Sequence, residues 1–163
     1  MKQEIQEKQQ NETNKVELLE NLLSTPPFDN RMTWNEYFMA IALLVSHRSP
    51  SPRLKVGSVI VSNRHIISCG YNGFPAGAPH ISIVRDNHEQ NTIHAEQNAI
   101  SDAARRGVSI ENSDIYITHY PCINCAKFII SSGIKKIFYH SEYKNDELVK
   151  ELFKVSKIDI IKI

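Results

Sequence analysis

At 163 residues the chain has the length of a single domain, and its 41% hydrophobic and 23% charged residues suit a globular protein with a buried core. The formal net charge of +1 gives no overall electrostatic field that would favour nucleic acid or a membrane surface as a partner. No stretch approaches the ~18 uninterrupted apolar residues of a membrane span, and the Gln- and Glu-rich N-terminus has no signal-peptide pattern.

The predicted elements begin with an N-terminal extension, residues 1–30, ahead of a domain over residues 31–163. Residues 1–14 are polar and charged, and we expect them to be frayed or disordered. A short apolar stripe at helical spacing follows, formed by Val16, Leu18, Leu19, Leu22 and Leu23. It predicts a helix that docks on the domain, with a subunit-contact arm as the alternative. Residues 24–30, with two prolines, are predicted to be a linker.

The domain is predicted to start with a helix. Thr33 is a candidate N-cap and Glu36, three residues later, completes a capping box, so the helix is expected to run to about Ser46. Its predicted core face comprises Trp34, Phe38, Ile41, Ala42 and Val45.

Strands and helices then alternate. Residues 57–61 and 65–69 flank Asn63-Arg64 and predict a hairpin. A long loop over residues 70–91 leads to a helix that ends at Gly107. Further strands are predicted over residues 115–118, 135–139 and 158–163, with helices after Pro121 and over residues 146–155. This alternation favours an α/β sheet with parallel neighbours and helices on both faces.

Two motifs, each at a predicted helix start, carry metal-binding chemistry. They are His94-Ala95-Glu96 and Pro121-Cys122-Ile123-Asn124-Cys125. Zinc prefers nitrogen and sulfur ligands, and a catalytic zinc site keeps its fourth position open for water. Cys122 and Cys125 are spaced to face the same side of a first helical turn, whose positive end favours thiolates. The motifs therefore predict a catalytic zinc site with His94, Cys122 and Cys125 as ligands.

Glu96 is predicted to be an unliganded proton shuttle rather than a fourth ligand. Bound zinc lowers the pKa of water from 15.7 to about 7. A carboxylate beside it can take a proton from that water, deliver it to a ring nitrogen and protonate the departing amine, as in a zinc-dependent nucleobase deaminase.

Each motif alone has a simpler interpretation. A lone His-Xaa-Glu is usually an exposed polar pair, and a lone Cys-Xaa-Xaa-Cys suits a structural zinc half-site or a redox pair. The only other cysteine is Cys69, predicted to be a buried strand residue, so a four-sulfur site has no second pair. Three cysteines also argue against a disulfide framework and for a reducing, cytoplasmic location.

From Trp34 to the C-terminus the chain closely resembles the deoxycytidylate (dCMP) deaminases of the cytidine deaminase-like superfamily. The resemblance rests on residues 70–75, 94–100 and 116–127, with Val56-Gly57 and residues 143–146 as further family elements. It implies a three-layer α/β/α fold with a mixed five-stranded sheet. It also implies one catalytic Zn²⁺ per chain and hydrolysis of dCMP to dUMP and ammonia, which supplies dUMP for thymidylate synthesis. Many such relatives are homohexamers activated by dCTP and inhibited by dTTP with Mg²⁺.

The resemblance also implies substrate-binding residues. Asn72 matches an asparagine that reaches the sugar hydroxyl, and the Ala95 backbone amide would meet the base carbonyl. Arg48 and Arg53 match arginines of which one would bind the 5′-phosphate, since a guanidinium suits a bidentate phosphate contact. Tyr143 is a weaker candidate for the nucleotide pocket. The alternatives are a solvated loop for both arginines and a turn role for Asn72 before its neighbouring glycine.

The chain departs from this pattern in two places. After Pro75 many relatives carry a Cys or His of a second, structural zinc site, but here no full second site is matched, and His80 and His88 are interpreted as loop histidines. The N-terminal extension has no counterpart in the usual pattern.

Three alternatives remain. A tRNA adenosine deaminase would need a basic face and a different loop, and a free cytidine deaminase would need no phosphate-binding arginine. A non-catalytic relative of the DNA-uptake (competence) type is disfavoured because a binding module needs no unliganded acid such as Glu96.

Overall fold

The computed structural model describes residues 14–86 and 88–163, so most of the predicted disordered segment lies outside the described residues. The chain divides into two compact units, one ending at Thr33 and one spanning Trp34–Ile163. In the first, residues 14–23 form the predicted helix and residues 24–30 form turns. Its docking on the domain stays a prediction. Within the described segments, no helix combines the length and apolar character that crossing a membrane requires.

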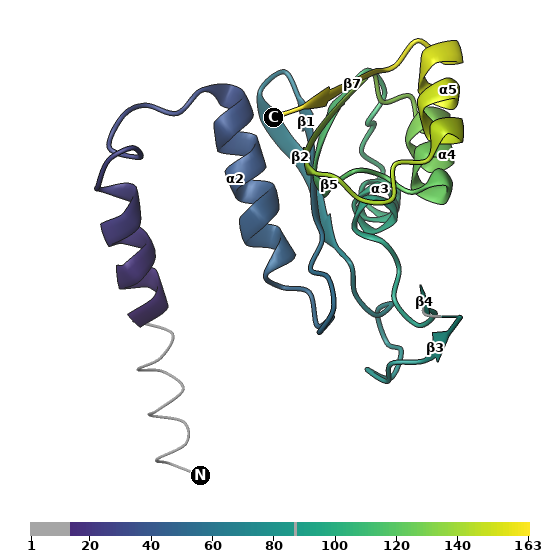
Figure 1. Cartoon of the computed structure of the whole chain (residues 1–163), viewed down its shortest axis with the longest axis horizontal. Coiled ribbons are helices and arrows are strands. Elements are labelled where there is room, and N and C mark those ends of the chain that lie inside the picture. The colour runs from purple at the N-terminus through teal and green to yellow at the C-terminus, as the bar shows by residue number, and fades with distance from the viewer. Residues whose placement is uncertain (1–13, 87) are drawn as a thin grey trace. The chain divides into compact units, whose positions relative to one another are not determined.

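A five-stranded mixed sheet forms the centre of the second unit (Figure 1). Its order is β2 (His65–Tyr71), β1 (Gly57–Ser62), β5 (Asp114–His119), β6 (Lys136–Ser141) and β7 (Asp159–Lys162). β1 is antiparallel to both β2 and β5, whereas β5, β6 and β7 are parallel. Asn63 and Arg64 close the predicted hairpin with φ values of 49° and 65°, as a type I′ turn requires.

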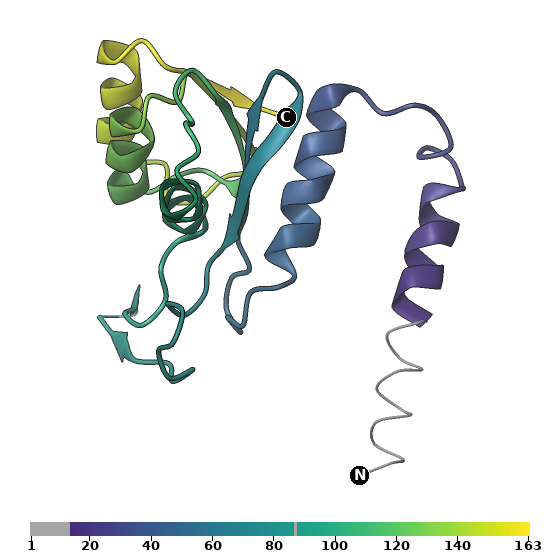
Figure 2. The ribbon, with the colours of Figure 1, turned by 180° about the vertical axis from the view of Figure 1, so that it is seen from behind.

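Helices cover both faces of this sheet (Figures 1 and 2). α2 (Trp34–Ser46) lies on one face; α3 (Ala95–Arg105), α4 (Ile123–Ser131) and α5 (Glu147–Val155) lie on the other. The sheet residues alternate accordingly, because Tyr116 packs in the cluster beneath α2 whereas Ile115 and Ile117 pack in the cluster beneath the other three helices. The predicted three-layer α/β/α fold is confirmed.

The buried face of α2 differs from the predicted one at its first residue. Phe38, Met39, Ala42 and Ser46 are buried, but Trp34 remains 44% exposed. Its ring is stacked on Phe38, and the Arg64 guanidinium lies 5.4 Å from the ring centroid. The predicted core position of Trp34 is therefore wrong, because only part of this large ring is covered at the start of the helix.

Cys69 is exposed, so the prediction of a buried strand cysteine is wrong. Successive strand residues face opposite sides of the sheet, and in β2 it is Ser68 and Gly70 that face α3. The Ser68 hydroxyl donates a 2.7 Å hydrogen bond to the carbonyl of Ala99. Cys69 thus points to the other side of an edge strand, where its thiol is uncovered.

The predicted loop over residues 70–91 is shorter than expected. β2 continues through Tyr71, and the loop contains a small hairpin of β3 (Val84–Arg85) and β4 (His88–Glu89). The Glu89 carboxylate accepts hydrogen bonds from the backbone amides of Ile83 and Asn91 at 3.1 and 2.9 Å. Two-residue strands are too short to produce a periodic sequence signal.

Candidate metal centre and active site

His94 stands at the N-cap of α3 in an extended conformation, with φ −71° and ψ 157°. The first turn of α3 lies against β2 at Gly70, where an added Cβ would be 2.4 Å from both the Ala95 carbonyl oxygen and the Ala99 nitrogen. Asn98 also donates a 2.9 Å hydrogen bond to the carbonyl of Tyr71. These contacts fix the start of α3, and hence His94, against the end of β2.

The two cysteines come from the next crossover of the chain. After β5, the Tyr120 amide donates a 2.8 Å hydrogen bond to the Ser141 carbonyl, which holds the turn that leads into α4. Cys122 is the N-cap of α4, and Cys125 lies in its first turn. Because β5 and β6 are parallel, this turn lies at their carboxyl edge, where ligand sites of such sheets form.

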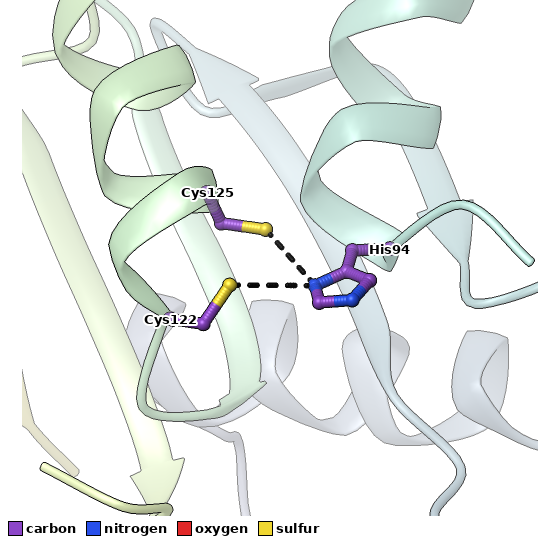
Figure 3. Close-up of side chains that lie close together, drawn as sticks. All are labelled: His94, Cys122 and Cys125. Carbon is purple, nitrogen blue, oxygen red and sulfur yellow. Dashed lines mark hydrogen bonds between the residues drawn. The ribbon is translucent and has the colours of Figure 1, made fainter. Parts of the chain in front are cut away.

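The three predicted metal ligands lie together (Figure 3). His94 Nδ1 is 3.3 Å from the Cys125 sulfur and 3.5 Å from the Cys122 sulfur. A tetrahedral zinc centre with bonds of about 2.0–2.3 Å separates its ligand atoms by roughly 3.3–3.8 Å. One nitrogen and two sulfur donors at this spacing fit zinc and leave one coordination position free.

Glu96 lies beside this group but is not a member of it. It occupies the first turn of α3 and is only 4% exposed. Burial raises the pKa of its carboxyl group, although a hydrogen bond with Cys125 acts in the opposite direction. A buried carboxyl group with a raised pKa beside a metal site is suited to accept and release protons.

The two thiols are unequal in the metal-free protein. A hydrogen bond from Cys125 lowers the pKa of the Cys122 thiol, and His94 acts in the same direction. The same bond, together with burial, raises the pKa of Cys125. The Cys122 thiol therefore loses its proton easily. This favours metal binding, because a cysteine binds a metal as its thiolate.

Asn72 is engaged with the backbone of a neighbouring segment. Its Oδ1 accepts a 2.8 Å hydrogen bond from the Val56 amide, and its Nδ2 donates a 2.9 Å hydrogen bond to the Leu54 carbonyl. These bonds anchor the segment that precedes β1. The predicted contact of Asn72 with a sugar hydroxyl stays a prediction.

The other predicted substrate residues occupy different settings. Ala95 is fully buried as the first residue of α3, so its amide belongs to the helix N-terminal amides that lack an intrahelical partner. Arg48 and Arg53 are exposed on the segment between α2 and β1. Tyr143 follows β6, is half-buried and packs against the core cluster beneath α3, α4 and α5.

The loop histidine His80 is exposed and stacks on Phe74 with ring centroids 5.0 Å apart. The side chain of His88 lies outside the described residues.

One residue near the site was missed from the sequence. His119 is the last residue of β5, three positions before Cys122, and its Nδ1 lies 2.9 Å from the Thr118 hydroxyl. Burial lowers its pKa, as does the neighbouring His140. Its position at a strand end next to the cysteine motif was the available signal.

The comparisons with known proteins agree with this geometry. Residues 32–141 match the family described as the cytidine and deoxycytidylate deaminase zinc-binding region. The chain belongs to this family. The resemblance to deoxycytidylate deaminases is confirmed, and the chain is a hydrolytic deaminase by family and by structure.

Three similar proteins illustrate the range of the family. ComE operon protein 2 of Bacillus subtilis is 43% identical over 134 residues, covering 80% of this chain and 71% of that protein. Human deoxycytidylate deaminase is 34% identical over 127 residues, covering 72% and 70%. The crystal structure of dCMP deaminase from cyanophage S-TIM5 in complex with dCMP and dUMP matches with a TM-score of 0.74 at 32% identity, covering 82% of this chain and all of that one.

Proposed function

We propose that the protein is a zinc-dependent deoxycytidylate deaminase that converts dCMP and water to dUMP and ammonia and so supplies dUMP for thymidylate synthesis. The observation that carries this proposal is the group of His94, Cys122 and Cys125 with the buried Glu96 beside it. The similarity to deoxycytidylate deaminases supports the choice of substrate.

His94, Cys122 and Cys125 would hold Zn²⁺. When bound, zinc supplies a Lewis acid that makes water acidic enough to serve as a nucleophile near neutral pH. Glu96 takes a proton from the attacking water and gives it to the ring nitrogen next to the reacting carbon. Glu96 then transfers the second water proton to the amino group, which leaves as ammonia while the water oxygen remains as the new carbonyl oxygen.

Several groups of the domain would position the nucleotide. The Ala95 amide donates to the base carbonyl, since it lies at a helix N-terminus next to both His94 and Glu96. Asn72 has one Nδ2 hydrogen left for the sugar hydroxyl after its bond to Leu54. Arg48 or Arg53 binds the 5′-phosphate.

Tyr143 contributes to the nucleotide pocket from the segment that follows β6. Residues 31–163 make up the deaminase domain, and residues 1–30 are an N-terminal extension of it. We further propose a cytoplasmic homohexamer that is activated by dCTP and inhibited by dTTP with Mg²⁺.

The test is ammonia release by the zinc-loaded protein with dCMP, cytidine, dCTP or an adenosine-containing tRNA stem-loop, each with and without dCTP or dTTP as effector. Selective turnover of dCMP is expected, because only dCMP combines a cytosine with a single phosphate for the arginines. Turnover of cytidine or of the stem-loop in preference to dCMP would contradict the proposed substrate.

A second candidate is a non-catalytic binding protein related to DNA uptake, favoured by the 43% identity to ComE operon protein 2. Such a protein would bind zinc at the same three residues without turning over any of these substrates. The buried Glu96 favours the enzyme, because burying a carboxyl group costs stability that a purely structural zinc site has no reason to incur.

A further inference from the structure

His119 occupies a position at the edge of the candidate active site that the proposed function does not use. It ends β5, pairs with Ser141 of β6, and lies three residues before Cys122 in the same chain segment. Its side chain is half-buried. It is therefore held close to the turn that carries two of the three metal ligands.

The hydrogen bonds of Thr118 favour one tautomer of His119. Thr118 is 1% exposed, and its hydroxyl accepts a 3.1 Å hydrogen bond from the Gly57 amide. Its own proton has one acceptor within reach among the described residues, which is His119 Nδ1 at 2.9 Å. A neutral imidazole that accepts at Nδ1 carries its hydrogen on Nε2. His119 thus presents an N–H donor whose orientation is fixed by its neighbour.

The pairing of β1 with β5 relates His119 to Val56, the residue that is hydrogen-bonded to Asn72. Ser58 of β1 and Ile117 of β5 form the last pair of this ladder, and the Gly57 amide donates to the Thr118 hydroxyl, so continuing the register by one residue brings Val56 towards His119. On its other side, Val56 exchanges hydrogen bonds with Asn72 at 3.1 and 2.8 Å. Asn72 and His119 consequently flank the same residue at one edge of the sheet.

We propose that His119 is a further substrate-binding residue, whose Nε2–H donates a hydrogen bond to an oxygen of the pyrimidine or deoxyribose part of the nucleotide. This inference rests on the proposed function and adds a specificity-determining contact to it. The reacting end of the base must lie at the metal ligands, and His119 belongs to the segment that bears Cys122. Arg48 and Arg53 are exposed on the segment between α2 and β1, and the proposed function assigns the 5′-phosphate to one of them.

Three substitutions separate a substrate contact from a structural one. His119→Gln keeps an N–H donor near the position of Nε2, whereas His119→Asn keeps an acceptor near the position of Nδ1 for the Thr118 hydroxyl. His119→Ala removes both. With zinc-loaded protein, we expect His119→Ala and His119→Asn to raise KM for dCMP and for deoxycytidine alike. The increase should be about 3- to 10-fold, which corresponds to the loss of one hydrogen bond. The KM values of His119→Gln should stay within about 2-fold of those of the wild type.

The pattern of rescue decides the outcome. A wild-type KM in His119→Asn together with a raised KM in His119→Gln would overturn the proposal, because it would show that His119 acts by accepting the hydrogen bond of Thr118. A KM increase confined to dCMP would place the contact at the phosphate, and unchanged KM in all three variants would remove the contact altogether.

A measurement independent of turnover separates this inference from the proposed function. Binding of the product dUMP should shift the Nε2 and Hε2 resonances of His119 in the ¹⁵N-labelled, zinc-loaded protein. If the wild type turned over no dCMP, the proposed function would fail while this shift still reported the contact. An unshifted His119 ring in protein saturated with dUMP would contradict the inference even in an active enzyme.

Discussion

Gly70 and Ala95 approach so closely that a single methyl group on the glycine would be 2.4 Å from the Ala95 carbonyl oxygen. The same methyl group would be 2.4 Å from the backbone nitrogen of Ala99. Both neighbours are helix backbone and cannot rotate away, so α3 reaches its position over β2 only because residue 70 has no side chain. The location of His94 depends on this contact, since His94 caps the same helix.

Gly70→Ala should therefore destabilise the protein and weaken zinc binding together. Overpacking against helix backbone costs about 1–3 kcal/mol, and the displaced helix start carries His94 with it. Chemical denaturation and zinc titration would measure the two effects. Gly77→Ala is the control, because a Cβ at Gly77 meets nothing within 4 Å, although its φ of 82° adds a local strain. Equal zinc affinity for Gly70→Ala and Gly77→Ala would contradict this role of Gly70.

Removal of one sulfur ligand should abolish stoichiometric zinc binding. Cys122→Ser leaves His94 and Cys125 as two donors of the group, too few for a stable tetrahedral site. Cys69→Ser is the matched control, since Cys69 is exposed and outside the group. Metal analysis should find one zinc per chain in the wild type and in Cys69→Ser.

Chelation of zinc should lower the melting temperature of the wild type, because a ligand that binds only the folded state stabilises it. The same treatment should leave Cys122→Ser unchanged. A chelator-sensitive melting temperature in Cys122→Ser would show that the metal binds elsewhere.

Asn72→Ala should loosen the segment between α2 and β1. The substitution leaves the Val56 amide and the Leu54 carbonyl without their partners, at a cost of about 1–3 kcal/mol if both stay shielded from water. We expect a raised KM for dCMP as well as lower stability. Ser49→Ala loosens the same segment, because the Ser49 hydroxyl bonds to the Asn72 carbonyl, but it leaves the Asn72 side chain intact. Equal KM effects in both variants would refute a direct sugar contact by Asn72.

Asp102 should make the stability of the fold sensitive to acid. Burial raises its pKa, but hydrogen bonds from Arg106 and Ser68 outweigh burial and hold the pKa below its ordinary value. A depressed carboxyl pKa contributes stability that is present above the unfolded-state pKa of about 3.9 and is lost as the pH falls through the folded-state pKa. The contribution is small, about 0.2–1 kcal/mol, because the pair is partly exposed to solvent.

The comparison with Asp102→Asn isolates this effect from the other carboxyl groups. Unfolding free energies should show the wild type more stable at pH 6, with the difference shrinking below about pH 4. A difference that stayed constant from pH 6 to pH 3 would show that the charge of Asp102 has no part in it.

The parts of the fold that follow from local sequence signals were predictable. α2 has the predicted bounds, which the Thr33 and Glu36 sequence pattern and the helical spacing of apolar residues indicate. The type I′ hairpin at Asn63-Arg64 and the helix end before Gly107 are likewise local features.

The exposure of Cys69 was not predictable, because it depends on which face of an edge strand another element covers. The sequence motifs predicted that His94, Cys122 and Cys125 would meet, since ligand chemistry constrains their spacing. They did not reveal His119, whose position depends on the pairing of β5 with its neighbouring strands, and they did not reveal the backbone anchor formed by Asn72.

The most direct test is the rate of ammonia release from dCMP by zinc-loaded wild type and by Glu96→Gln, with the zinc content of both preparations measured. Glutamine fills the same buried space but cannot transfer protons. Equal zinc content and a loss of turnover by at least about 100-fold would support Glu96 as the proton shuttle of a deaminase. Turnover retained in Glu96→Gln, or absent from the fully zinc-loaded wild type, would contradict it.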